Sequence, residues 1–171
     1  MTGLSGEDFD LLVIGGGITG CGVARDAAMR GLKVALVERD DFASGTSGRS
    51  SRLVHGGIRY LEHGQLHLVY ESIRERQTLL RIAPHLVKPL AFTWPVYRGA
   101  RVGRLRLSAG LLAYYLMAGG RSRLFSTLNS RETVEREPSL GSAGLTGSAV
   151  YYDASTDDAR LTVANALAAQ Q

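Results

Sequence analysis

The pattern of apolar and polar positions predicts that the N-terminal part of the chain folds as a strand, a helix and a second strand. Residues 10–14 form a short run rich in branched apolar side chains, which indicates a buried strand. A helical pattern extends over residues 19–30, and Gly31 follows where a helix often ends in the left-handed conformation. A second apolar run, residues 34–37, leads directly to Glu38. This is a strand–turn–helix–strand unit closed by a carboxylate.

Beyond this unit, the pattern predicts further helices and two extended segments. We expect a helix at 65–83, an extended segment at 89–97 in which Trp94 serves packing, and a helix at 105–117. These are followed by a short helix at 130–137 capped by Ser130 and a strand at 147–152. A last helix begins at Asp157 and Asp158. The chain stops at Gln171 within this last helical pattern, without a cap or stop signal, so we expect a piece of a longer protein.

Composition narrows the class of protein. The chain has 171 residues, of which 44% are hydrophobic and 21% charged, as in an ordinary globular domain. The N-terminus is short and polar, and no stretch approaches the ~18 apolar residues of a membrane-spanning helix. The single cysteine, Cys21, excludes an internal disulfide, and no Cys/His spacing suggests a metal site. We expect a cytoplasmic protein without a metal, in which Cys21 is a small buried residue rather than a reactive thiol.

Charge is unevenly distributed, although the formal net charge is only +4. Residues 98–123 contain six arginines and no acid, lysine or histidine, and they surround the apolar helix predicted at 105–117. Such a segment could contact an anionic membrane surface. The alternative is a buried helix with solvated flanks, and the sequence does not decide between the two. No binding motif accompanies the arginines, so we expect no nucleic-acid partner.

Three glycines after the first strand, Gly15, Gly17 and Gly20, have the G-x-G-x-x-G spacing of dinucleotide-binding turns. Gly15 permits the tight turn, Gly17 lets the backbone approach a pyrophosphate, and Gly20 lets the helix pack on the strand. Glu38 can accept hydrogen bonds from both hydroxyls of an adenosine ribose and would repel the 2′-phosphate of NADP. The alternative, a glycine-rich structural turn, is disfavoured because Gly31 and Glu38 fall in register with the motif.

A second candidate for cofactor contact is the segment 43–52, which is dense in hydroxyl groups, glycine and arginine. Its hydroxyls and backbone N–H groups could bind the pyrophosphate or ribitol of a long dinucleotide; the alternative is a solvated loop. Beyond it, the pair Gly56-Gly57 permits close backbone approach to a flat ring. Arg59 carries a forked guanidinium that can bind an anion.

The order of these features resembles the FAD-dependent glycerol-3-phosphate dehydrogenases, within the D-amino-acid-oxidase-like flavoenzyme superfamily. The most specific match is TSGRSSRLVHGGIRYLE at 46–62, supported by IAPHLVKPL at 82–90 and DDARL at 157–161. The resemblance implies an α/β, Rossmann-like FAD-binding fold (glutathione-reductase-like, D-amino-acid-oxidase type) with part of an α+β substrate domain. Residues 1–90 would form the FAD-binding core and cofactor loop, 91–150 the start of a substrate- or membrane-facing region, and 151–171 a return to the FAD-binding domain.

The resemblance also implies roles for individual residues. The pyrophosphate would be held by Gly15, Gly17 and Gly20, and the adenosine ribose by Glu38. The inner half of FAD would lie along Thr46, Ser47, Ser51 and Leu53. The isoalloxazine region would lie near His55, Gly56 and Gly57. Arg59 would point toward the substrate phosphate. His55 is a candidate base, although a contact with the cofactor is favoured and the base is expected downstream.

The reaction implied is oxidation of the C2 hydroxyl of glycerol 3-phosphate to give dihydroxyacetone phosphate, with hydride transfer to flavin N5. The electrons would pass to a quinone, with oxygen as the acceptor in oxidase relatives. Placement on the inner face of the cytoplasmic membrane is implied, and a homodimer of the longer protein stays open. We expect the 171 residues alone to retain FAD weakly or not at all, and to show no turnover.

Three other functions stay open at this point. A related FAD oxidase could act on an amine or amino acid, but Arg59 and its hydroxyl-rich surroundings favour a phosphate ester. A nucleotide-binding or membrane-docking module without turnover would be colourless when purified. A plain NAD-binding domain is disfavoured by the second loop after Glu38, which suits the longer FAD.

Overall fold

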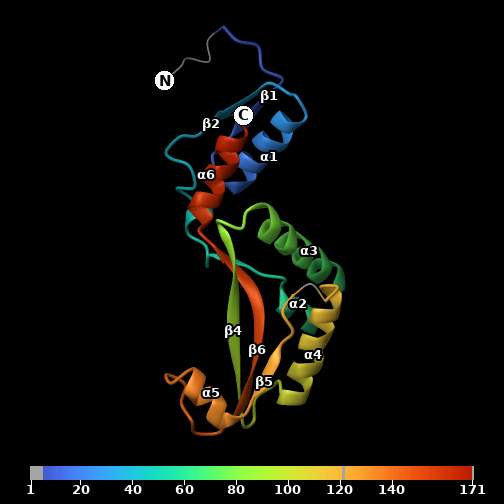
Figure 1. Ribbon diagram of the computed structural model, residues 1–171. Coiled ribbons are helices and arrows are strands. Elements are labelled where there is room, and N and C mark those ends of the chain that lie inside the picture. Colours follow the sequence, from blue (N-terminus) through green and yellow to red (C-terminus); the bar gives the residue numbers. More distant parts are fainter. Residues whose placement is uncertain (1–5, 121, 171) are drawn as a thin grey trace. The chain divides into compact units, whose positions relative to one another are not determined.

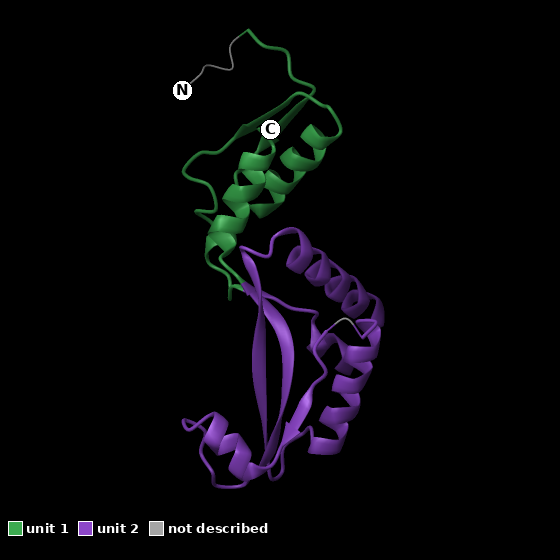
Figure 2. Cartoon of the chain, viewed as in Figure 1, with its two compact units in different colours: residues 1–52, 156–171 green, residues 53–155 purple. Residues whose placement is uncertain are grey.

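The computed structural model describes residues 6–120 and 122–170 and divides into two compact units. Unit 1 comprises residues 1–52 and 156–171, and unit 2 comprises residues 53–155, as Figure 2 shows. The N-terminal residues before Gly6, Arg121 of the arginine-rich segment and the chain end at Gln171 lie outside the described residues. The expected functional boundaries at residues 90 and 150 stay a prediction, because the two units are defined by packing alone.

Unit 1 contains the predicted strand–turn–helix–strand arrangement (Figure 1). Strand β1 (Leu11–Ile14) pairs in parallel with β2 (Val34–Val37), in a register that places Leu11 opposite Val34. Helix α1 (Ile18–Met29) joins them, because a parallel pair requires a crossover connection rather than a tight hairpin turn. Gly31 has a φ of +81°, which confirms the left-handed residue expected after the helix.

Small residues line the buried face of α1, where Cys21, Ala24 and Ala27 are buried. Helix α6 (Asp158–Ala168) packs against α1, and Arg25 Nη1 donates to Asn165 Oδ1 at 3.1 Å. Burial raises the pKa of the Cys21 thiol, which disfavours the reactive thiolate. The predicted structural position of Cys21 is therefore confirmed.

Unit 2 is a small sheet with helices packed on it. Its elements are β3 (Leu53–Val54), α2 (Ile58–Glu62), α3 (Leu66–Ile82), β4 (Val87–Tyr97), α4 (Arg104–Met117), β5 (Ser126–Leu128), α5 (Ser130–Arg136) and β6 (Leu145–Thr156). The strand order is β3-β6-β4, with β5 also paired to β6. Strand β6 runs antiparallel to β3 and to β5.

Among the described residues, two apolar clusters contribute to the core of unit 2. One joins α3 to α4 through Val69, Ile73, Tyr114 and Ala118. The other joins α4 to the sheet through Val96, Leu107, Leu111 and Ala149. Helix α4 therefore packs against both α3 and the sheet, because it contributes buried residues to both clusters.

Several details of unit 2 differ from the sequence-based expectation. The strand expected at 147–152 extends over the twelve residues of β6, and β3 pairs with it at residues 154–155, beyond the expected end. Ser130 is not the cap of α5: Asn129 is, with its Oδ1 accepting from Glu132 N at 3.0 Å and its N–H donating to Glu132 Oε2 at 2.7 Å. Strands β3 and β5 and helix α2 were too short for the periodicity to reveal. Trp94 serves packing as expected, and the centroid of its ring lies 6.5 Å from the centroid of the Tyr151 ring.

No helix among residues 6–120 and 122–170 is both long enough and apolar enough to cross a membrane.

Replacement of Gly20 by Ala should destabilise unit 1 by about 1–3 kcal/mol, because an added methyl group would overlap the carbonyl oxygen of Gly15. Gly22 is a matched control in the same helix, since a Cβ there would meet no atom within 4 Å. Gly22→Ala should stabilise the chain by about 0.5–1 kcal/mol. Urea unfolding followed by circular dichroism measures both, and an equal effect of the two variants would contradict the close approach at Gly20.

Candidate functional site

Glycines form the turn between β1 and α1, and packing leaves little or no room for a side chain at several of them. Gly15 has a φ of +110° and donates its N–H to Val37 O at 2.8 Å. A Cβ on Gly16 would lie 2.8 Å from the ring of Phe42 and 3.1 Å from Glu38 Cβ. At Gly17 a Cβ would lie 3.1 Å from Ser47 Oγ. The sequence motif identified Gly15, Gly17 and Gly20, but it gave Gly16 no role.

The N-terminus of α1 has the properties of an anion site. The first N–H groups of a helix have no intrahelical acceptor, and no acidic residue stands in the first turn of α1. Ser47 Oγ accepts from Ile18 N at 2.9 Å, which brings the short 3₁₀ helix η1 (Thr46–Gly48) to this helix end. The structure thus brings the glycine turn and the predicted second cofactor segment together within unit 1. A helix N-terminus of this kind favours phosphate groups.

Glu38 is fixed against the same turn by both of its oxygens. Oε2 accepts from Gly16 N at 2.6 Å and Oε1 accepts from Asp40 N at 2.9 Å. The backbone N–H groups of Asp40 and Gly16 hold the pKa of the Glu38 carboxyl below its ordinary value. The carboxylate is therefore ionised at neutral pH. Each of its oxygens retains a second lone pair that can accept from a ribose hydroxyl.

The segment 43–52 packs against the rest of unit 1 and is not a loose solvated loop. Ala43 is buried, and its N–H donates to Gly16 O at 3.0 Å. Ser50 donates to Asp158 Oδ2 through both its N–H, at 3.2 Å, and its Oγ, at 2.8 Å. The Ser50 hydroxyl lowers the pKa of Asp158. Thr46 and Ser51, two predicted cofactor residues, are exposed along this segment.

The remaining predicted site residues belong to unit 2. Leu53 lies in β3 opposite Ser155, and Gly57 adopts a φ of +65° before α2. His55 is exposed, and its Nδ1 accepts from Gly57 N at 3.1 Å. A neutral imidazole that accepts at Nδ1 carries its proton on Nε2, so His55 offers an N–H donor to its surroundings. Arg59 is exposed on α2.

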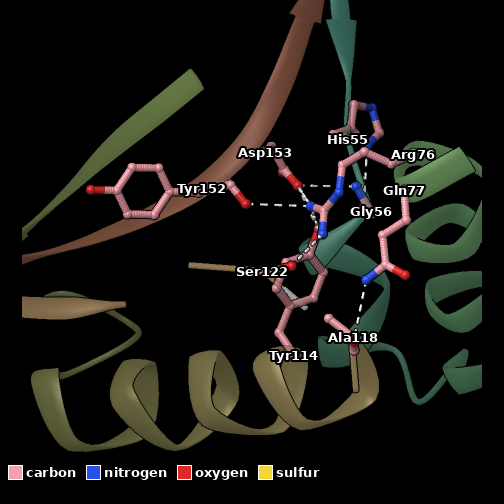
Figure 3. A network of polar contacts seen from close by, with 10 residues as sticks. His55, Gly56, Arg76, Gln77, Tyr114, Ala118, Ser122, Tyr152 and Asp153 are labelled. Carbon is pink, nitrogen blue, oxygen red and sulfur yellow. Dashed lines mark hydrogen bonds and ion pairs between the residues drawn. The ribbon is translucent and has the colours of Figure 1, made fainter. Parts of the chain in front are cut away.

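Gly56 has no room for a side chain, because a Cβ there would overlap Tyr114 Oη and lie 2.7 Å from Ile73 Cγ1. Its N–H donates to Asp153 Oδ1 at 3.3 Å. The sequence interpretation, close approach to a flat ring, did not include this contact within the protein. Asp153 belongs to a buried polar network with Arg76 and Tyr114 (Figure 3).

Sequence reasoning missed this network, although Arg76 gave a signal. Val69, Ile73 and Arg76 share one face of α3 and all three are buried. A charged residue in the apolar stripe of an amphipathic helix indicates a buried partner. Among the described residues, no group of three His, Cys, Asp or Glu side chains is arranged to hold a metal ion.

The profile of the family described as "FAD dependent oxidoreductase" matches residues 10–171, and the chain belongs to this family. Over 161 residues the chain is 47% identical to the aerobic glycerol-3-phosphate dehydrogenase of Staphylococcus saprophyticus, a match that covers 94% of this chain and 29% of that protein. The enzyme of the same name from Staphylococcus haemolyticus is 44% identical over the same shares. The chain spans about three-tenths of the length of these relatives.

A solved structure, the glycerol-3-phosphate dehydrogenase from Bacillus halodurans complexed with FAD, is similar to this chain with a TM-score of 0.69 and 36% identity. The match covers 97% of this chain and 25% of that protein. The L-proline dehydrogenase from P. horikoshii, at 18% identity and a TM-score of 0.66, shares the fold. The predicted fold class and the FAD cofactor are thereby confirmed.

The residues of unit 1 fit the adenosine and pyrophosphate parts of FAD. Glu38 supplies carboxylate oxygens for hydroxyl groups, and the glycine turn leaves the N-terminus of α1 open to an anion. The assignment of individual cofactor and substrate residues, from Gly15 to Arg59, stays a prediction.

Replacement of Glu38 by Gln should flatten the loss of stability of unit 1 in acid. Because the folded-state pKa of Glu38 is lowered, its stabilising contribution is complete above the ordinary value of 4.5 and is lost as the pH falls through the folded-state value. Glu38→Gln should unfold more readily than the original chain at about pH 7, with a smaller further loss below pH 4.5. Urea midpoints across this pH range measure the difference.

Asp26→Asn is the matched control. Asp26 also has a lowered pKa, but through the exposed side chain of Arg30, so its contribution should disappear at high salt. Acid sensitivity in Glu38→Gln equal to that of the original chain would contradict the anchoring of Glu38 by backbone N–H groups.

Proposed function

We propose that this chain provides the FAD-binding segment of an enzyme that oxidises sn-glycerol 3-phosphate to dihydroxyacetone phosphate. The observation that carries the proposal is the 36% identity, over 97% of the chain, to a glycerol-3-phosphate dehydrogenase complexed with FAD. The 47% identity to an aerobic glycerol-3-phosphate dehydrogenase supports the same substrate. FAD, when bound, supplies the acceptor of the hydride and thus the redox chemistry.

Residues of unit 1 would hold the first half of the cofactor. The turn at the N-terminal end of α1, shaped by Gly15, Gly17 and Gly20, would receive the pyrophosphate. Glu38 would receive the adenosine ribose. The hydrogen bond from Ile18 N to Ser47 Oγ supports a place for the 46–51 segment beside that turn. Thr46, Ser47, Ser51 and Leu53 would continue along the inner half of FAD.

His55 would act as a hydrogen-bond donor to the flavin region rather than as the catalytic base. Because its Nδ1 accepts from Gly57 N, the imidazole has its proton on Nε2 and cannot accept another there. Gly56 and Gly57 shape the same loop. The base that takes the C2 hydroxyl proton is not assigned among these residues.

Arg59 would bind the substrate phosphate. Its side chain is exposed at the surface of α2, and a guanidinium can form two parallel hydrogen bonds to a phosphate dianion. This preference for a phosphate dianion separates the proposal from its alternative, an amine or amino-acid oxidase.

We also propose that a quinone accepts the electrons. The rates at which a soluble quinone and oxygen reoxidise the reduced flavin distinguish a quinone acceptor from oxygen. Sedimentation of the longer protein measures its oligomeric state and shows whether it forms a homodimer.

A chimaera tests the function directly. Residues 10–171 of this chain replace the matching segment of the Staphylococcus saprophyticus dehydrogenase, to which they are similar. The purified chimaera should be yellow, and its flavin absorbance should bleach without oxygen on addition of glycerol 3-phosphate, but not of glycine or a D-amino acid. A chimaera that folds but cannot be reconstituted with FAD would overturn the proposal.

Arg59→Met in this chimaera should raise the KM for glycerol 3-phosphate by about 10- to 100-fold, which is the value of a hydrogen bond between charged groups. The flavin spectrum should not change, because Arg59 is proposed to contact only the substrate. Steady-state kinetics with a dye acceptor give KM. Arg131→Met, at a highly exposed arginine of α5 paired with Glu135, is the control and should leave KM unchanged. An unchanged KM in Arg59→Met would remove the phosphate role.

We further propose that α4 docks on an anionic membrane surface. One face of α4 is buried through Leu107, Leu111 and Tyr114. The other carries an exposed apolar stripe of Leu105, Leu112 and Leu116, at 87%, 46% and 64% exposure. The stripe, with exposed Arg104 and Arg106 at its N-terminal end, has the composition of an interfacial helix.

The double variant Leu112→Ser/Leu116→Ser should reduce flotation of the chain with phosphatidylglycerol vesicles by at least about tenfold, because each buried leucine contributes about 1.5–3 kcal/mol. Flotation of the original chain should weaken at high salt and be absent with neutral phosphatidylcholine vesicles. Leu66→Ser, at an exposed leucine of α3, is the control. No flotation of the original chain at low salt would contradict membrane docking.

A further inference from the structure

A buried ion pair joins helix α3 to the sheet of unit 2. Arg76 on α3 and Asp153 on β6 form an ion pair, and each side chain is only 2% exposed. Tyr114 on α4 accepts from Arg76 Nη1 at 2.8 Å and donates to Asp153 Oδ1 at 2.7 Å. Ser122 Oγ and Tyr152 O accept from the same guanidinium, at 3.1 and 3.3 Å. Figure 3 shows how three elements direct these polar groups to one point.

The network reaches outward through the backbone of the 55–57 loop. Asp153 Oδ1 accepts the N–H of Gly56, and the next N–H, that of Gly57, donates to His55 Nδ1. Both N–H groups of the glycine pair are therefore used within the protein. The Nε2–H of His55, whose side chain is exposed, can still donate a hydrogen bond to a ligand.

Stability alone does not account for a buried ion pair. Removing two charges from water is costly, and well-packed apolar residues in their place are often as stable or more stable. Burial lowers the pKa of Arg76 and raises the pKa of Tyr114 to about 12, so the phenol keeps its proton and serves as a fixed donor to Asp153. Gly56 leaves space for this phenol, because a Cβ there would overlap Tyr114 Oη.

We propose that Arg76, Asp153 and Tyr114 form a positioning unit that fixes the Gly56–Gly57 backbone and thereby holds the His55 imidazole as an Nε2–H donor. The three residues act through the loop and touch no ligand themselves. The identity of the acceptor that His55 meets, an atom of the flavin or of its substrate, rests on the proposed function. The fixed tautomer of His55 does not, and it can be measured in the chain without FAD.

Two variants remove the unit in different ways. Arg76→Met/Asp153→Leu replaces both charges together, so no unpaired charge is left in the core. Tyr114→Phe removes one hydroxyl and keeps the ring. Gln77→Ala is the matched control: Gln77 Nε2 donates to Ala118 O at 2.9 Å, so this variant loosens the packing of α3 on α4 without touching Gly56.

Nitrogen-15 NMR of the 171-residue chain at about pH 8, where an ordinary imidazole is neutral, reports the His55 tautomer. The original chain and Gln77→Ala should show His55 protonated on Nε2 and slow exchange of the Gly56 and Gly57 amides. In Arg76→Met/Asp153→Leu, the tautomers should mix and the Gly56 amide should exchange at least about tenfold faster, as the loss of a hydrogen bond to a charged group requires. Tyr114→Phe should shift both in the same direction.

An original tautomer and original amide protection in both variants would show that the cluster only holds the fold together, and would overturn the proposal. If the double variant does not fold, Tyr114→Phe alone decides in the same way. FAD titration of each protein separates this inference from the proposed function. Failure of the chimaera to bind FAD would count against the function, whereas the tautomer and exchange measurements still decide the positioning role.

Discussion

The close approach of helix α1 to the turn after strand β1 is the constraint on which unit 1 depends. Gly20 stands against the carbonyl group of Gly15, where any side chain would overlap it. This contact sets the direction of α1, and with it the place where the helix N-terminus opens. Gly16 is then near enough for its N–H to reach Glu38, and Ile18 for its N–H to reach Ser47. One steric contact thus assembles a carboxylate, a hydroxyl and a helix end around a single turn.

Unit 2 fixes its loop by a different physical means. The 55–57 loop has little apolar material of its own, and its two glycines add no side-chain contacts. A buried carboxylate that accepts from Arg76, Tyr114 and Gly56 supplies the missing restraint. Strong hydrogen bonds in a region of low dielectric favour one arrangement of the loop over others. Steric exclusion in unit 1 and buried polar bonding in unit 2 both produce well-defined backbone next to residues proposed to meet FAD.

Much of the fold could be predicted because the main elements are long enough to show their period. Both ends of α1, α3 and α4 lie within one residue of the predicted ends, and Gly31 has the expected positive φ. The short elements β3, β5 and α2 escaped detection, since two to five residues do not display a period. The cap of α5 was placed one residue late, because Asn129 and Ser130 are both good caps and only the geometry selects Asn129.

The sequence by itself determined the dinucleotide-type turn, the carboxylate after the second strand and the resemblance to an FAD family, because these depend on residues near one another in the chain. Only the tertiary structure decided that Glu38 is anchored on Gly16, that Ser50 is anchored on Asp158, and that Arg76 meets Asp153. Those pairs are 22, 108 and 77 residues apart. Contacts at such separations follow from how strands and helices pack, and no local pattern of residue types encodes them.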